Sequence, residues 1–186
     1  MYDTTNKQLK VWNGSASITV ASYAPVLNYI TATQALTDTT FVDVIGTSPA
    51  TFTFSAVASG VYVAEYYLPV TFSGTGGLKV QFTTPSSPTA NSLSFEAALT
   101  VNVSTTDNLG ASIMRPVGSL SANSSTTIVT ADAGTYYTSG THVVKIHMLY
   151  QNGVNAGSVT LQAAQNSDNG TTTLSVGGTM RVERIA

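Results

Sequence analysis

The chain has 186 residues and a mass of 19.3 kDa, the size of one ordinary domain, and 42% of its residues are hydrophobic, which is enough for a core. Only 9% of the residues are charged, and seven Lys and Arg with a net charge of −2 are too few for the basic surface that nucleic-acid binding usually needs. The lack of cysteine excludes disulfides, thiolate metal sites and cysteine nucleophiles.

The first seventeen residues differ in character from the rest and contain the turn signal Asn13-Gly14. We expect residues 1–17 to form a small hairpin or an extended arm, and residues 18–186 to form the main domain. Such arms often dock to a neighbouring protein. The candidate docking residues are Tyr2, Leu9, Val11 and Trp12.

Three segments alternate between apolar and polar residues with a period of two. They are residues 51–54, 78–83 and 93–103. This pattern predicts strands with one face on a core and the other face in water.

Two further strands are predicted over residues 61–72 and 142–150, and both are apolar on their two faces. In a small all-β domain a second apolar face usually packs on a partner subunit. The most apolar stretch of the chain, residues 56–72, contains Gly60, Glu65 and Pro69 and alternates like a strand, so we expect no membrane insertion.

Turn signals separate the later strands. Asn152-Gly153 follows the strand that ends at Tyr150, and Asn169-Gly170 separates residues 158–165 from residues 171–176. The last strand is predicted over residues 179–185. Some eight to ten strands at this spacing, without a well-capped amphipathic helix, predict an all-β, two-sheet antiparallel sandwich or jelly roll.

Two parts of the chain resemble known virion proteins. Residues 2–14, YDTTNKQLKVWNG, look like a short segment common in bacteriophage tail-fibre and related appendage proteins. Residues 159–166, VTLQAAQN, and 177–185, GGTMRVERI, resemble the final strands of C1q/TNF-like jelly rolls in phage structural proteins. Residues 60–68 and 76–82 fit the same group.

The resemblance implies a homotrimer of ten-stranded jelly rolls whose inner sheets pack around a threefold axis. Residues 61–72, 142–150 and 179–185 would then lie in the inner sheet, and residues 78–83 and 93–103 in the outer sheet. The candidate residues of the trimer interface are Val61, Val63, Tyr67, Val143, His147, Leu149, Arg181 and Glu183.

Catalytic and metal-binding patterns are weak. His142 and His147 are five residues apart in one predicted strand, so their side chains point to opposite faces and do not form a pair. The nine Asp and Glu residues are scattered over separate elements, and neither an EF-hand loop nor a His-x-His motif is present. We therefore expect a non-enzymatic protein without a cofactor or a metal site.

Exposed loop residues could contact a receptor or a glycan, because Tyr stacks on sugars and Asn binds their hydroxyl groups. The candidates are Tyr136, Tyr137, Asn166 and Asn169. The alternative is that the two tyrosines flank a strand and pack on the edge of the sandwich.

These observations together favour a trimeric tail-fibre or appendage module on the surface of a phage particle. Its expected partners are further copies of itself, other virion proteins and a host surface glycan or receptor. A capsid decoration or head-fibre protein of the same fold is an alternative, and a carbohydrate-binding module is another.

Overall fold

The computed structural model describes the backbone of residues 2–3, 8–12, 15, 17–20, 25–47, 50–74, 76–85, 93–100, 112–117, 125–129 and 141–186, and the side chains of residues 15, 25–47, 50–74, 76–85 and 142–186. Every regular element in this part of the chain is a strand. The described residues contain no helix long and apolar enough to cross a bilayer.

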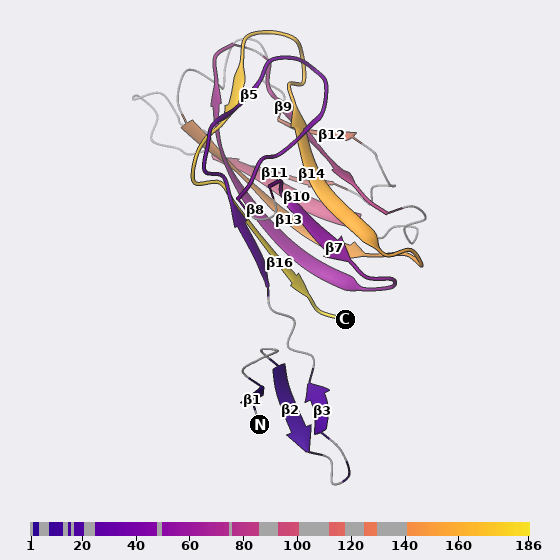
Figure 1. The fold of residues 1–186 in the computed structure, drawn as a ribbon. Coiled ribbons are helices and arrows are strands. Elements are labelled where there is room, and N and C mark those ends of the chain that lie inside the picture. The colour runs from indigo at the N-terminus through magenta and orange to yellow at the C-terminus, as the bar shows by residue number, and fades with distance from the viewer. Residues whose placement is uncertain are drawn as a thin grey trace.

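Three short strands near the N-terminus form a sheet of their own (Figure 1). They are β1 (Tyr2–Asp3), β2 (Gln8–Trp12) and β3 (Ser17–Val20), and both of their pairings are antiparallel. The backbone register places Leu9 between Tyr2 and Val20. Among the described strands, none of these three pairs with a strand of the larger sheets.

The remaining strands form two antiparallel sheets, so the predicted all-β sandwich is confirmed (Figure 1). Sheet I comprises β4 (Val26–Tyr29), β5 (Gln34–Leu36), β8 (Val61–Phe72), β10 (Leu93–Thr100), β11 (Ser112–Val117), β13 (Thr141–Gln151), β15 (Thr172–Leu174) and β16 (Thr179–Arg184). Sheet II comprises β6 (Val42–Asp43), β7 (Thr53–Ala56), β9 (Leu78–Thr83), β12 (Ser125–Val129) and β14 (Gly157–Ala164).

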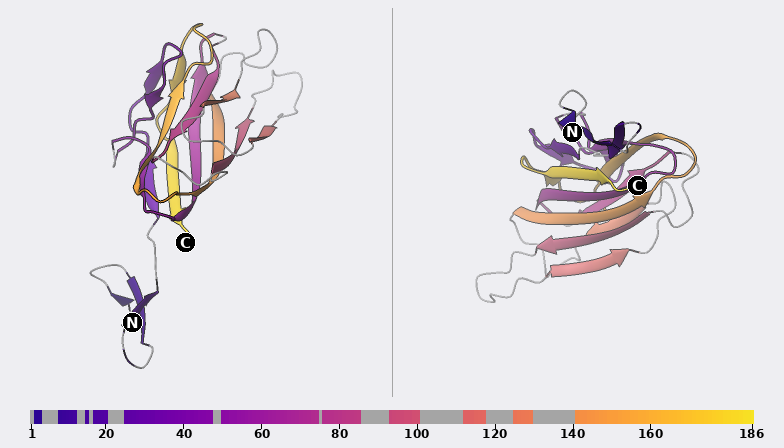
Figure 2. Two further views of the ribbon diagram at one scale, coloured as in Figure 1. Left: turned by 90° about the vertical axis from the view of Figure 1, so that its right-hand side faces the viewer. Right: turned by 90° about the horizontal axis from the view of Figure 1, so that it is seen from below.

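The strand order is that of a jelly roll. When β4, β7, β8, β9, β12, β13, β14 and β16 are numbered one to eight along the chain, the order is 1-8-3-6 in sheet I and 2-7-4-5 in sheet II. Three short strands extend the two sheets: β15 pairs with β8 and β5 pairs with β15 in sheet I, and β6 pairs with β14 in sheet II. The hairpin of β10 and β11 is inserted between the fourth and fifth strands and widens sheet I beyond β13 (Figure 2).

One predicted sheet assignment is wrong. Residues 93–103 were expected in the outer sheet together with residues 78–83, but β10 pairs with β13 in sheet I, with Leu99 opposite Val144 and Phe95 opposite Met148. The cause is that a period of two fixes which residues share a face of a strand and says nothing about which strand lies alongside it.

Pro69 lies in the central strand β8, where a residue without an N–H group is unusual. Its carbonyl oxygen accepts a hydrogen bond of 2.8 Å from the Ser175 nitrogen. The nitrogen and the carbonyl of one strand residue point to the same side, so the Pro69 nitrogen also faces the segment between β15 and β16. The register of β8 shifts by two residues across that segment. The missing donor of Pro69 therefore coincides with an interruption in the neighbouring strand.

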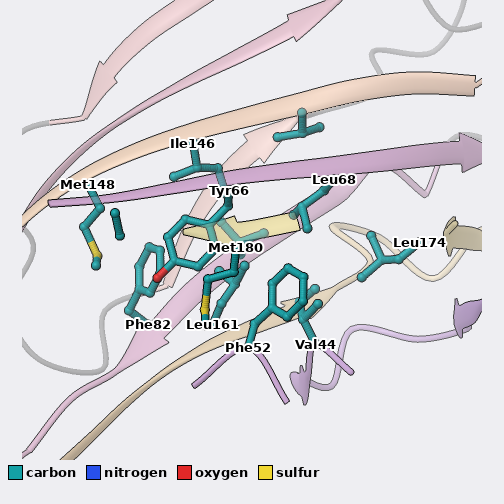
Figure 3. Close-up of a cluster of buried hydrophobic side chains, with 14 of the residues drawn as sticks. Val44, Phe52, Tyr66, Leu68, Phe82, Ile146, Met148, Leu161, Leu174 and Met180 are labelled. Atoms are coloured by element: carbon teal, nitrogen blue, oxygen red, sulfur yellow. The ribbon is translucent and has the colours of Figure 1, made fainter. Parts of the chain in front are cut away.

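The core lies between the two sheets and is centred on aromatic side chains of both (Figure 3). The Tyr66 ring of sheet I is 5.5 Å from the Phe82 ring of sheet II and 6.4 Å from the Phe52 ring, measured between centroids. The residues of β8, β9 and β13 that alternate into the core are fully or almost fully buried, as the sequence pattern predicts.

The hydroxyl group of Tyr66 is buried in this core and has no hydrogen-bond partner among the described residues. An unpaired buried hydroxyl lowers stability, because on folding it loses its hydrogen bonds to water and gains none in the protein. We expect Tyr66→Phe to raise the free energy of unfolding by about 1–2 kcal/mol at pH 7, measured by urea denaturation. A loss of stability would show that the hydroxyl does have a partner.

The same variant should also change the response to alkali. Burial raises the pKa of Tyr66 above its ordinary value and, with a smaller contribution from Tyr62, raises the pKa of Tyr150 to about 12. Because the unfolded chain loses these protons first, near pH 10, the stability that is complete below pH 10 falls as the pH rises towards 12. In Tyr66→Phe this fall should be shallower.

Candidate functional site: the outer face of sheet I

The solvent side of sheet I, here called the outer face, consists of the residues that alternate with the core residues along β8, β13, β16 and β4. The backbone register aligns them in rows that cross the strands. One row is Leu149, Val63 and Glu183. The next is His147, Glu65, Arg181 and Leu27, and the third is Lys145, Tyr67, Thr179 and Tyr29.

Large apolar side chains gather on this face. Leu27, Tyr29, Val63, Tyr67 and Leu149 are between 37% and 64% exposed although they come from three different strands. Single exposed apolar residues are ordinary on a protein surface, but neighbouring ones on one sheet mark an interaction surface. The outer face is therefore the strongest candidate site in the described part of the chain.

The solvent side of sheet II is different in character. The hydroxyl groups of Thr51, Thr53 and Thr160 form a ladder with oxygen distances of 2.7 and 2.8 Å. Beside it, the Gln81 amide donates to Gln162 at 2.6 Å, and the Gln162 amide donates to Asp43 at 2.7 Å. These polar side chains satisfy one another, as expected for a surface that stays in water.

The charged residues of the outer face pair across and along the strands. His147 Nδ1 lies 3.4 Å from Glu65 Oε1, on the neighbouring strand, and Arg181 Nη2 lies 3.4 Å from Glu183 Oε2, two residues away. Lys145 Nζ lies 5.2 Å from the centre of the Tyr67 ring, within the range of a cation–π contact. Charges of both signs among apolar residues suit a protein–protein contact.

The structure brings all eight predicted interface residues onto this one face. Val61 and Val143 are half-buried on it, and Val63, Tyr67, His147, Leu149, Arg181 and Glu183 lie in the three rows. The two histidines do point to opposite sides of β13, because His142 is buried in the core against Phe72 while His147 lies on the outer face. Whether a second chain covers the face stays a prediction.

The sequence analysis missed the contribution of β4, which places Leu27 and Tyr29 on the outer face. The inward position between them is Asn28, a polar residue, so the usual alternation was hidden. Asn28 is buried because its amide donates to the Thr51 carbonyl at 2.8 Å and its oxygen accepts from the backbone nitrogens of Tyr29 and Thr47. From the sequence alone, an Asn that is buried in a strand and binds a loop cannot be told from an Asn in an exposed loop.

The predicted receptor contacts are not brought together with this face. Asn166 and Asn169 lie in the turn between β14 and β15, where the Asn166 nitrogen donates to the Gly76 carbonyl at 2.8 Å. Tyr136 and Tyr137 lie outside the described residues. For Tyr2, Leu9, Val11 and Trp12 the structure gives the backbone pairing in β1 to β3 described above.

The sequence-based comparisons found no relative: no protein-family model and no curated protein matches the chain. Among solved structures, those of the Gx and Gt strains of infectious bursal disease virus each contain a chain that is 13% identical to this one, with a TM-score of 0.22. The Gx alignment covers 94% of this chain and 40% of the viral chain, and the Gt alignment covers 95% and 43%. The VP2 subviral particle of the same virus is 10% identical with a TM-score of 0.16, over 97% of this chain and 43% of that chain. This chain thus spans less than half of those viral chains, and a likeness at such scores assigns neither fold nor function.

Proposed function

We propose that this chain is a non-enzymatic structural protein of a phage particle, a tail-fibre or appendage module that works as a homotrimer in attachment to the host surface. The observation that carries the proposal is the outer face of sheet I, where exposed apolar residues of β4, β8 and β13 lie together on a jelly roll. In the C1q/TNF-like proteins that residues 159–166 and 177–185 resemble, the corresponding sheet packs around a threefold axis.

The place on the particle is supported by the sequence of residues 2–14, which resembles a segment of tail-fibre proteins. In this proposal β1 to β3 fasten the module to another virion protein, and the loops of three jelly rolls contact the host together. Three weak contacts on one rigid body bind more tightly than one, because the second and third form at high effective concentration.

The solution mass tests the trimer directly. We expect light scattering on a sizing column to give about 58 kDa, three times the chain mass of 19.3 kDa. A monomer at all accessible concentrations would overturn the proposal and would favour a single-chain carbohydrate-binding module, which a glycan array would then detect.

Attachment requires a second test. The purified trimer should compete with phage particles for adsorption to host cells, and antibodies against it should label the fibres or other appendages in electron micrographs. Labelling of the head instead would support a capsid decoration or head-fibre protein of the same fold.

A further inference from the structure

Three charged groups of the outer face share its central row. His147 of β13, Glu65 of β8 and Arg181 of β16 are directly opposite one another in the backbone register. Each flanking row holds large apolar side chains beside one charged residue. Val63 and Leu149 lie with Glu183 on one side, and Tyr67 and Tyr29 lie with Lys145 on the other. A partner that covers the apolar residues must therefore also cover the charged row.

The carboxylate of Glu65 depends on His147 for its ion pair. The distance between His147 Nδ1 and Glu65 Oε1 is 3.4 Å, and it is the one ion pair of Glu65 among the described residues. The two neighbouring cations have other contacts: Arg181 pairs with Glu183, and Lys145 lies over the Tyr67 ring. Across the other edge of β13, the register places a second acidic residue, Glu96, opposite His147.

Water stabilises Glu65 as long as the face is open, since its side chain and that of His147 are 32% and 38% exposed. When the face is covered, a carboxylate beside a neutral imidazole loses water without gaining a full counter-charge, and this is costly. A carboxylate beside a protonated imidazole keeps its counter-charge. Histidine is the side chain that ordinarily changes charge between pH 5 and 8.

We infer that assembly through the outer face is coupled to proton uptake at His147, so that the homotrimer is tighter at mildly acidic pH than at mildly alkaline pH. This inference rests on the proposed function, because it requires the outer face to be the trimer interface. His142, the other histidine, is buried in the core of its own jelly roll against Phe72 and does not face the interface. The proton-linked group is therefore His147, with Glu65 as its partner.

The experiment is sedimentation equilibrium of the full chain at pH 5.5, 6.5 and 8. We expect the protein concentration at half-assembly to be at least about tenfold lower at pH 5.5 than at pH 8, because each protomer takes up a proton on assembly. Glu65→Gln should assemble at pH 8 as tightly as the native chain at pH 5.5, since no buried carboxylate then needs a counter-charge. His147→Gln should assemble weakly at every pH.

Glu183→Gln is the matched control, because it removes a carboxylate from the same face whose partner is Arg181. It should keep the pH dependence of the native chain. A trimer whose half-assembly concentration is the same from pH 5.5 to 8 overturns this inference and leaves the proposed function standing. A chain that is monomeric at every pH overturns both. A pH dependence that persists in Glu65→Gln and in His147→Gln would locate the proton elsewhere.

Discussion

Replacing Asn152 by alanine is expected to lower the free energy of unfolding by about 3–5 kcal/mol. Asn152 is buried where β13 ends, and its side chain joins three segments. Its oxygen accepts from the Tyr150 hydroxyl at 2.7 Å, and its amide donates at 2.8 Å to the carbonyls of Val57 and of Asn155. Alanine would leave the buried Tyr150 hydroxyl and the two part-buried carbonyls without this partner, and an unpaired buried group costs about 1–3 kcal/mol. Urea denaturation followed by tyrosine fluorescence or circular dichroism measures the change.

The control for this prediction is Tyr150→Phe, which removes one hydrogen bond to Asn152 and leaves the amide contacts in place. It should cost about 1 kcal/mol. If Asn152→Ala costs no more than Tyr150→Phe, water must enter and satisfy the carbonyls of Val57 and Asn155, and the proposed importance of the amide is wrong.

Asn152 also illustrates what the sequence could not reveal. Asn152-Gly153 was interpreted as a turn signal, and the chain does turn there, with the Asn152 nitrogen donating to the Gly60 carbonyl at 2.8 Å. The side chain, however, binds a loop about ninety-five residues earlier in the chain. A local pattern contains the preference of Asn for turns but carries no information about a distant carbonyl that requires a donor.

Three of the predicted strands match the structure closely. Residues 61–72 and 78–83 match β8 and β9 at both ends, and β13 extends the predicted residues 142–150 by one residue at each end. The reason is physical: the two faces of these strands meet different surroundings, so burial selects alternate residues. The outer face could be predicted for the same reason, because Val63 and Leu149 are apolar at positions that a single jelly roll exposes.

The sequence predicted less well which sheet each strand joins and where the short strands lie. The pairing of β10 with β13 depends on a long connection that no local pattern specifies. The strands β5 and β6 have only three and two residues, too few for a period to show. β6 forms on the edge of the longer strand β14, and β5 forms on the edge of β15, which itself has only three residues and pairs with β8.

The outer face and the polar side of sheet II offer a direct comparison of two surfaces on one molecule. Leu149 of β13 is 50% exposed beside Val63, while Ser158 of β14 is exposed beside Ser55 on the other sheet. Both positions lie in long strands and on solvent-facing sides, so a charged residue at either one should be tolerated by the fold of the single chain. The two differ in whether the proposed trimer buries them.

We expect Leu149→Glu to convert the trimer to a monomer of 19.3 kDa and Ser158→Glu to leave the trimer intact. In the trimer the variant would lose the burial of a leucine side chain and would place a carboxylate among apolar residues, at a cost of about 2–4 kcal/mol per protomer. This corresponds to a loss of about 30- to 1,000-fold in affinity for each protomer. Leu149→Met, which keeps an apolar side chain of similar volume, should assemble like the native chain.

Light scattering and sedimentation of the three variants, with circular dichroism to establish that each is folded, decide the matter. A Leu149→Glu chain that remains trimeric would show that the subunits meet through a surface other than the outer face, and the exposed apolar residues would then need a different partner. A Ser158→Glu chain that dissociates while folded would place the contact on sheet II. The proposed arrangement requires the trimer to cover the outer face, because a second copy packed there would remove the neighbouring apolar side chains of Leu27, Tyr29, Val63, Tyr67 and Leu149 from water.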